Sequence, residues 1–177
     1  MQLVTPRLQL APIKPGDAEA MFSLLSDRAI YRYLDYGPPP SAAHLRSVYE
    51  RQAAGKSPDG KQRWFNWIVR DLREQPLGYV QATVLEDGRA YVAYVFASKY
   101  WGRGYASESV RAMIRYLCQA CGVQHFLATV EALNQPSINL LIRLGFTEVP
   151  VTPAPPVALA ESERLYELVL QAVTSAP

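Results

Sequence analysis

Alternating and helix-spaced apolar positions divide the first third of the chain into elements. Apolar residues alternate over residues 7–13, which predicts a short strand. After Asp17 they recur every three or four positions, as in an amphipathic helix, and Asp17 is expected to cap that helix. Residues 37–40 read Gly-Pro-Pro-Pro and end this structure, so Ser41 is expected to begin a second helix.

Three segments rich in aromatic and β-branched residues come next, at residues 64–70, 77–85 and 90–97. Such composition is typical of strands. The Asp87-Gly88 pair is a hairpin signal between the last two segments. Because all three are joined by short turns, they are expected to form an antiparallel meander.

The period of the apolar pattern changes after the meander. From Val110 a helical stripe continues to Gly122, and residues 124–130 then predict another strand. A strand, a helix and a strand in this order favour one parallel pairing, because the crossover returns the chain in the same direction. We therefore expect an α/β fold with a mixed, mostly antiparallel sheet.

The C-terminal part of the chain predicts one more helix and one more strand. The helix is expected over residues 136–144, ending at Gly145, and the strand over residues 164–170. Residues 149–161 contain four prolines and are expected to form an irregular connection.

Composition narrows the classes of protein. The 177 residues carry 18 Lys and Arg against 16 Asp and Glu, a net charge of +2. This length predicts one domain over residues 1–177. The near balance of charge argues against a nucleic-acid partner. Residues 116–130, the longest stretch without charged side chains, number 15, fewer than the roughly 20 that span a bilayer, so no membrane partner is expected.

The two cysteines, Cys118 and Cys121, are three positions apart in the predicted long helix. A zinc site needs further ligands, and the chain has only His44 and His125 to add. We interpret the cysteines as small apolar residues of a helix face and expect no metal. Without a disulfide framework or a secretory signal, the default compartment is the reducing cytoplasm.

The candidate chemistry lies at a glycine turn between a strand and a helix. Gly102 and Gly104 precede the long helix, where unpaired amides and the positive end of the helix dipole favour phosphate oxygens. The P-loop pattern is missing, and a dinucleotide fingerprint would need Gly or Ala where Ser107 stands. Lys99 and Arg103 can add positive charge. A plain tight turn remains the alternative interpretation.

The string WGRGYASE, residues 101–108, resembles the acyl-CoA loop of the GNAT superfamily of N-acetyltransferases, with Trp101 where the family pattern has Arg or Gln. The form is similar to that of the RimJ/RimL-like branch, which acetylates ribosomal proteins. Residues 5–27, 76–84 and 134–146 resemble the opening strand and helix, the meander and the Asn-x-x-Ser segment of that branch.

This resemblance implies a GNAT fold whose middle strands splay apart, and acetyl transfer from acetyl-CoA to an amine in a ternary complex. The pantetheine arm is expected to pair with the backbone of the strand that ends at Phe96, whose amide N–H would stabilise the oxyanion. Asn134 is expected to contact the arm; the alternative is an Asx cap on the next helix. The expected cofactor-binding residues are Tyr94, Val95, Phe96, Trp101, Gly102, Arg103, Gly104, Tyr105, Ala106, Ser107 and Asn134.

Catalytic assignments rest on the same resemblance. Many family members place a tyrosine seven residues after the asparagine, where this chain has Leu141. Ser137 is therefore the candidate proton donor to the thiolate, against the alternative of a first-turn residue that bonds the backbone. Glu131 is the candidate general base, with Glu163 as a second candidate, against the alternative of exposed carboxylates.

The acceptor is expected to be a protein N-terminal amine or a small primary amine. The resemblance points to Tyr31, Tyr33 and Tyr36 as substrate-binding residues, with packing under the first helix as the alternative. Residues 153–156 are expected to rim the opening. Aromatic residues at 64–67 are better explained by a packed strand than by a single-stranded nucleic-acid platform. A non-catalytic acyl-CoA sensor is the alternative function, and a homodimer is left open.

Overall fold

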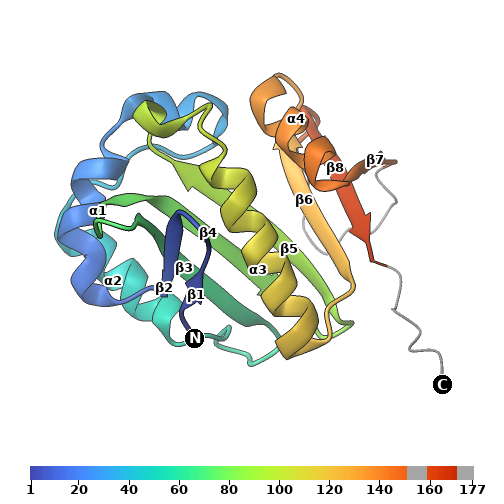
Figure 1. The fold of residues 1–177 in the computed structure, drawn as a ribbon, viewed down its shortest axis with the longest axis horizontal. Coiled ribbons are helices and arrows are strands. Elements are labelled where there is room, and N and C mark those ends of the chain that lie inside the picture. The colour runs from blue at the N-terminus through green and yellow to red at the C-terminus, as the bar shows by residue number, and fades with distance from the viewer. Residues whose placement is uncertain (151–158, 171–177) are drawn as a thin grey trace.

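A computed structural model describes residues 1–150 and 159–170, and Figure 1 shows the arrangement of its elements. The helices and strands lie in the order that the apolar pattern predicts. The helices are α1 (Ala18–Leu25), α2 (Ala42–Ala53), α3 (Tyr105–Cys121) and α4 (Gln135–Leu144). The strands are β1 (Leu3–Val4), β2 (Leu8–Pro12), β3 (Arg63–Asp71), β4 (Pro76–Val84), β5 (Arg89–Phe96), β6 (His125–Glu131), β7 (Thr147–Val149) and β8 (Glu163–Val169).

The strands form one mixed sheet in the order β1-β2-β3-β4-β5-β6-β8-β7. The meander β3-β4-β5 is antiparallel, and β5 and β6 pair in parallel across the crossover helix α3, so both predictions are confirmed. An Asp-Gly turn joins β4 to β5, and Gly88 there has φ 83°, a conformation that glycine adopts without steric cost.

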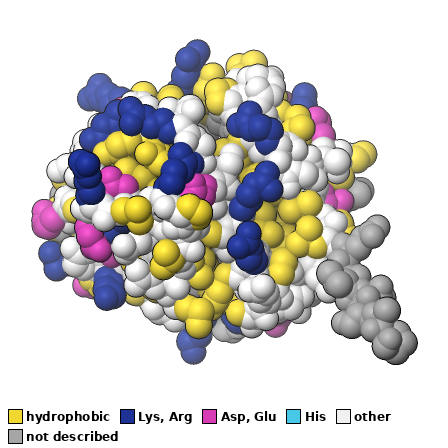
Figure 2. All heavy atoms as spheres, in the orientation of Figure 1, with side chains coloured by type: hydrophobic (Ala, Val, Ile, Leu, Met, Phe, Trp, Pro, Cys, Tyr) yellow, Lys and Arg dark blue, Asp and Glu magenta, His cyan; other side chains and the backbone are white. Residues whose placement is uncertain are grey.

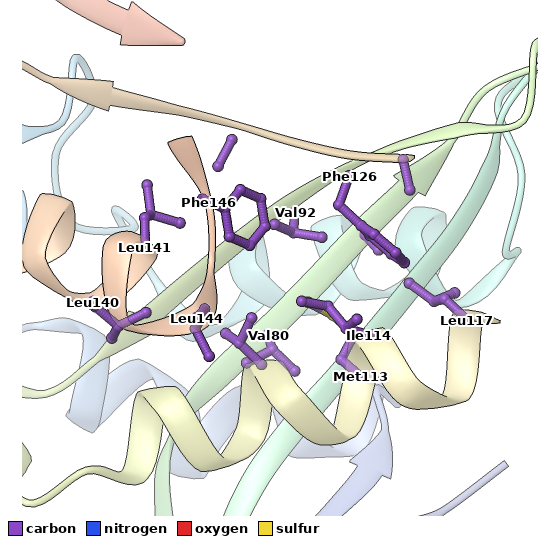
Figure 3. Packing of buried hydrophobic residues seen from close by; sticks show 14 of the residues in the cluster. Val80, Val92, Met113, Ile114, Leu117, Phe126, Leu140, Leu141, Leu144 and Phe146 are labelled. Atoms are coloured by element: carbon purple, nitrogen blue, oxygen red, sulfur yellow. The ribbon is translucent and has the colours of Figure 1, made fainter. Parts of the chain in front are cut away.

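Alternation along the strands sends side chains to two cores on opposite faces of the sheet. On β3, Trp67 and Val69 belong to the core under α3 and α4, whereas Ile68 belongs to the core under α1 and α2. Figure 3 shows Met113 and Leu117 of α3 pointing at the first of these cores. The helices therefore cover both faces of the sheet: α3 and α4 cover one face, and α1 and α2 cover the other.

Three short elements have no strong signal in the sequence. β1 is two residues long, β7 is three, and the 3-10 helix η2 (Arg28–Tyr33) is six. Asp17 is the N-cap residue of α1, as predicted, but its side chain makes no capping hydrogen bond. Its carboxylate instead accepts hydrogen bonds from the Lys14 amide and the Arg70 guanidinium. Ser41 does cap α2, accepting a hydrogen bond from the His44 amide at 3.0 Å.

The two central strands separate toward their C-terminal ends. β5 and β6 pair only from Arg89–His125 to Tyr91–Leu127, although β5 continues to Phe96 and β6 to Glu131. Figure 1 shows β6 diverging from β5. This confirms the expected splay, and it leaves part of the inner edge of β5 without a strand partner. Within the described residues, no helix is long and apolar enough to cross a membrane.

Candidate active site

A cavity of about 740 Å³ lies where β5 and β6 separate. Four segments line it: the η2 region, the end of β5, the loop into α3 with the first turn of α3, and one face of α4 with Asn134 before it. Most of the expected cofactor-binding residues are brought together here. Those in the lining are Tyr94, Val95, Phe96, Trp101, Gly102, Gly104, Tyr105, Ala106, Ser107 and Asn134.

The glycine turn presents a run of unpaired amides to this cavity. Gly102 and Gly104 have φ values of 72° and 78°, which turn the chain sharply into α3. Among the described residues, no acceptor pairs with the backbone N–H groups of residues 102–107, and the first paired amide is that of Glu108, bonded to the Gly104 carbonyl at 3.0 Å. Such a nest at the start of a helix of 17 residues favours phosphate oxygens.

Trp101, which stands where the family pattern has Arg or Gln, stabilises the turn from within. Its indole Nε1 donates a hydrogen bond to the Phe96 carbonyl oxygen at 2.7 Å. This bond joins the end of β5 to the loop that follows it. The departure from the family pattern therefore preserves the local fold of the turn.

Arg7, which the sequence pattern did not single out, braces the same turn from outside. Its guanidinium contacts the Glu108 carboxylate at 2.6 Å and donates to the Arg103 carbonyl at 3.0 Å. It also lies over the Tyr105 ring, 4.9 Å from the centroid. Burial raises the pKa of Glu108, but hydrogen bonds from Thr5 and Arg7 outweigh it and hold that pKa below its ordinary value.

The inner edge of β5 carries backbone groups that face the cavity. Hydrogen bonds from the Ala97 amide to Leu77 and from the Leu85 amide to Arg89 fix the odd-numbered residues of β5 as the partners of β4. In an antiparallel ladder the alternate residues face the other way. The amides of Tyr94 and Phe96 therefore point toward β6, beyond the last β5–β6 pair.

Gly78 allows β4 to approach β5 closely at this point. A Cβ on Gly78 would collide with the Val95 carbonyl oxygen and would lie 2.8 Å from the Phe96 Cα. Real Cβ atoms do not approach backbone so closely, so any side chain here would shift Phe96. A glycine inside a strand is the usual sequence sign of such a close approach.

Asn134 caps α4, as the alternative interpretation had it, and its expected contact with the pantetheine arm stays a prediction. Its side-chain oxygen accepts a hydrogen bond from the Ser137 amide at 3.3 Å, capping α4, and the residue also lines the cavity. Ser137 does not bond the backbone through its hydroxyl as the alternative had it. Its Oγ instead lies 2.7 Å from the Tyr94 hydroxyl, across the gap between α4 and β5.

The three acceptor-side tyrosines have different environments. Tyr33 lines the cavity with Ala29, Ile30 and Leu34 of the η2 region. Tyr31 is outside the lining, and its hydroxyl donates to the Leu25 carbonyl at 2.8 Å, which agrees with packing under α1. Tyr36 is 52% exposed and contacts Tyr31 edge to face.

The candidate bases are not among the cavity-lining residues. Glu131 accepts a hydrogen bond from Ser162 at 2.7 Å, and Glu163 accepts one from the Ala160 amide at 2.9 Å. Arg103 is likewise outside the lining, and its carbonyl accepts a hydrogen bond from Arg7. Residues 153–156, which were expected to rim the opening, lie outside the described residues.

The core explains two further sequence features. Leu141 is 1% exposed and points into the interior beside Phe146 (Figure 3). Trp67 is buried and stacks on Phe65 with ring centroids 5.9 Å apart, as the packed-strand interpretation predicted. Trp67 and Phe65 therefore pack as residues of a core strand.

Arg143 on α4 is a cavity residue that the sequence analysis missed. It is the charged side chain in the lining formed by the described residues. Figure 2 shows other basic side chains on the same face, over and beside α3. The sequence did not mark Arg143 as a ligand-binding residue, because exposed arginines are common on amphipathic helices. The charge suits an anionic ligand.

A splayed sheet with a free strand edge, a nest of amides and an arginine on the facing helix agree with the site expected of an acyl-CoA-dependent transferase. The model of the family described as "Acetyltransferase (GNAT) domain" matches residues 7–147. The chain therefore belongs to the GNAT acetyltransferases and is an N-acetyltransferase that uses acetyl-CoA as its co-substrate.

Relatives and solved structures agree with this assignment. The chain is 30% identical over 146 residues to a Bacillus licheniformis protein described as an uncharacterized N-acetyltransferase, p20, covering 81% of each protein. The structure of a RimL ribosomal L7/L12 α-N-protein acetyltransferase with coenzyme A has a TM-score of 0.80 at 16% identity, covering 96% of this chain and 98% of that one. A Salmonella typhimurium acetyltransferase that modifies the N-terminal serine of L7/L12 has a TM-score of 0.79 at 15% identity, covering 97% and 100%.

Proposed function

We propose that this enzyme acetylates a weakly basic primary amine, either the α-amine of a protein N-terminus or a small-molecule amine. The cavity at the β5–β6 splay carries the proposal, since it joins the amide nest to an apolar wall. Two of the structurally similar enzymes are described as acting on protein α-amines. Their low sequence identity supports the fold alone, so the acceptor must be argued from the cavity.

The cofactor half of the cavity has groups suited to the diphosphate and to the pantetheine thioester arm of acetyl-CoA. The free amides of residues 102–107 suit the diphosphate, and Arg143 adds positive charge nearby. The unpaired inner edge of β5 offers the amides of Tyr94 and Phe96 to the pantetheine arm and the thioester. We assign oxyanion stabilisation to the Phe96 amide, because it points into the gap and its carbonyl is already engaged by Trp101.

Ser137 is the proposed proton donor to the departing thiolate. It lines the cavity on the first turn of α4, opposite the end of β5. Leu141, at the position of the family tyrosine, is buried in the core and has no proton to give. A hydroxyl group that faces the thioester region is therefore supplied by Ser137 or by its neighbour Tyr94.

The acceptor amine must be neutral to attack, and the lining offers little help in removing a proton. No carboxylate or imidazole of the described residues lines the cavity, and residues 151–158 and 171–177 contain no Asp, Glu or His. At pH 7 about one in ten α-amines of pKa ~8 is neutral, against a few in ten thousand lysine amines of pKa ~10.4. This difference favours α-amines and other weakly basic amines over lysine side chains.

The part of the cavity proposed to bind the acceptor has an apolar wall, and hydrogen bonds hold this wall to the segment that follows β5. Ile30, Tyr33 and Leu34 of the η2 region line it. Asp27 fixes this wall, because its carboxylate accepts hydrogen bonds from the Ala29 amide at 3.0 Å and the Ser98 amide at 2.8 Å. The hydrogen bonds from Ser98 hold the pKa of Asp27 below its ordinary value. An apolar wall without acidic groups does not suit polycationic acceptors such as polyamines.

Thiol release from acetyl-CoA over an amine panel tests the proposal. The panel contains two matched peptides: one has a free N-terminus and no lysine, and the other is N-acetylated and carries one lysine. Arylalkylamines, amino sugars and spermidine complete the panel. The α-amine peptide or a small weakly basic amine is expected to turn over, with the lysine peptide and spermidine at background. Preference for spermidine or for the lysine peptide would overturn the proposed acceptor class.

We also propose a cytoplasmic location, and this proposal rests on the cysteines. Cys118 and Cys121 are both free thiols in the structure, which supports a reducing compartment such as the cytoplasm. Sedimentation of the purified enzyme would establish whether it works as a monomer or as a homodimer.

A further inference from the structure

The hydroxyl groups of Tyr94 and Ser137 meet across the splayed gap. Tyr94 comes from β5 and Ser137 from the first turn of α4, and their oxygens are 2.7 Å apart. The Tyr94 hydroxyl also lies 3.3 Å from the Ser137 carbonyl oxygen. Both acceptors within reach of the phenol therefore belong to Ser137.

By resemblance, many family members carry a tyrosine on the helix that corresponds to α4, seven residues after the asparagine. The corresponding residue here, Leu141, is buried and faces the core. A phenol nevertheless reaches the α4 side of the cavity, because Tyr94 extends from the strand on the opposite side. The tyrosine that meets α4 in this chain therefore comes from β5, and its partner on α4 is Ser137.

We propose that Tyr94 is a positioning residue that orients and polarises the Ser137 hydroxyl for protonation of the coenzyme A thiolate. This inference rests on the proposed role of Ser137. When the phenol donates its hydrogen bond to Ser137 Oγ, the serine hydrogen is free to point into the cavity. The same hydrogen bond stabilises the negative charge that develops on Oγ as the serine proton leaves.

The phenol is suited to remain a donor throughout. Burial raises the pKa of Tyr94 to about 12, while the hydrogen bond with Ser137 and the charge of Arg143 act in the opposite direction. Tyr94 is therefore protonated across the working range of pH. A protonated phenol can donate its hydrogen to Ser137 Oγ, 2.7 Å away.

The proton balance of the reaction needs no further group. The C–N bond forms, the C–S bond breaks, and its electron pair passes to sulfur, which takes the proton of Ser137. The nitrogen loses one proton on becoming an amide, and that proton returns to Ser137. The protein ends the turnover in its starting protonation state, which agrees with a cavity lining without a carboxylate among the described residues.

The alternative role of the pair is a structural clip between β5 and α4. A clip and a positioning residue differ in what they change. Loss of a clip would let α4 move, which would weaken binding of coenzyme A and lower the melting temperature. Loss of a positioning residue would slow thiolate departure and would leave ground-state binding intact.

The test compares Tyr94→Phe, Ser137→Ala and the double variant, with Tyr91→Phe as the matched control. Tyr91 lies on the same strand, and its buried hydroxyl has no hydrogen-bond partner among the described residues. The measurements are kcat and KM for acetyl-CoA and for the best amine, the Kd of coenzyme A by calorimetry, and the melting temperature. Hydrolysis of acetyl-CoA without an amine is followed in parallel, because it expels the same thiolate.

Tyr94→Phe is expected to lower kcat about tenfold and Ser137→Ala about 10²-fold, with KM and Kd within about twofold of the wild type. The double variant is expected to match Ser137→Ala, because Tyr94 acts only through the serine. Tyr91→Phe is expected to behave as the wild type.

Wild-type kcat in Tyr94→Phe, a loss confined to KM or Kd, or losses that multiply in the double variant would each overturn the inference. A wild-type enzyme that transfers to none of the amines would instead overturn the proposed acceptor class. The hydrolysis rates would then still test Tyr94, with the same expected ratios between the variants.

Discussion

The Arg7 guanidinium lies 2.6 Å from the Glu108 carboxylate, so the residue before β2 is tied to the first turn of α3. The same guanidinium donates to the Arg103 carbonyl. Because Arg7 binds the Arg103 carbonyl on the outer side of the turn, we expect the amides of residues 102–107 to point toward the cavity. A contact between residues 101 positions apart in sequence thus shapes the phosphate nest.

Arg7→Ala should loosen this nest without unfolding the sheet. Because a hydrogen bond to a charged group is lost, we expect the Kd of coenzyme A to rise about fivefold, the equivalent of roughly 1 kcal/mol. Calorimetry measures the change. Arg46→Ala is the matched control, since Arg46 pairs with Glu19 on the surface at 3.8 Å and is expected to leave the Kd unchanged. If Arg7→Ala and the wild type bound coenzyme A with equal affinity, Arg7 would not support the phosphate nest.

The same contact predicts a dependence on pH. The pKa of Glu108 is lowered in the folded state, so its contribution to stability is full above the unfolded pKa of ~4.3 and is lost as the pH falls through the folded value. The difference in melting temperature between the wild type and Glu108→Gln should therefore be constant near neutrality and shrink below about pH 4. A difference that grows in acid would contradict this sign.

Gly104→Val should abolish binding of coenzyme A. The φ of 78° disfavours a β-branched residue, and a Cβ would lie 3.4 Å from the Arg7 guanidinium. Gly88→Val is the control, because Gly88 has a similar φ of 83° with nothing within 4 Å of a Cβ. Both variants should lose about 1–2 kcal/mol of stability from backbone strain, and only Gly104→Val should lose the ligand. Retained binding would show that the turn is not the phosphate site.

Gly78→Ala should impair catalysis more than binding. Its Cβ would push on Val95 and Phe96, and so displace the amide proposed to bind the oxyanion. We expect kcat to fall by about tenfold or more, since removing one oxyanion donor costs 10²–10³. Steady-state kinetics and calorimetry separate the two effects. Gly16→Ala, where a Cβ meets nothing within 4 Å, should leave kcat intact. An unchanged kcat in Gly78→Ala would argue against the Phe96 assignment.

Arg143→Gln should weaken coenzyme A through loss of charge. Arg143 lines the cavity, whereas Arg115 on α3 is exposed and outside the lining. Affinity is expected to fall about fivefold, and its dependence on salt should become shallower. Calorimetry at two ionic strengths checks this result, with Arg115→Gln as the control. If the affinity for coenzyme A depended on salt identically in both variants, Arg143 would not contact the ligand.

Local patterns in the sequence predicted the elements and the turn. Spacing of apolar residues gave the helices and the meander, and Gly102 and Gly104 marked the amide nest. These features depend on neighbours in sequence, so their physical causes can be read along the chain. The family resemblance added the splay, which no local pattern contains.

Contacts between distant residues could not be predicted in this way. The brace formed by Arg7, the approach of Gly78 to β5 and the Tyr94–Ser137 pair each join separate elements. Glu131 shows the converse, because its position at a strand end suggested a base, whereas its carboxylate bonds Ser162 outside the cavity lining. Its proposed catalytic role stays a prediction.

Backbone amide NMR of the enzyme titrated with coenzyme A tests the central claim most directly. The amide resonances of residues 102–107 should shift strongly, together with those of Tyr94 and Phe96, because these groups lack protein acceptors and face the ligand. Pantetheine, which lacks the diphosphate, should move Tyr94 and Phe96 but leave residues 102–107 in place. Resonances of residues 102–107 that stay fixed in saturating coenzyme A would contradict the account.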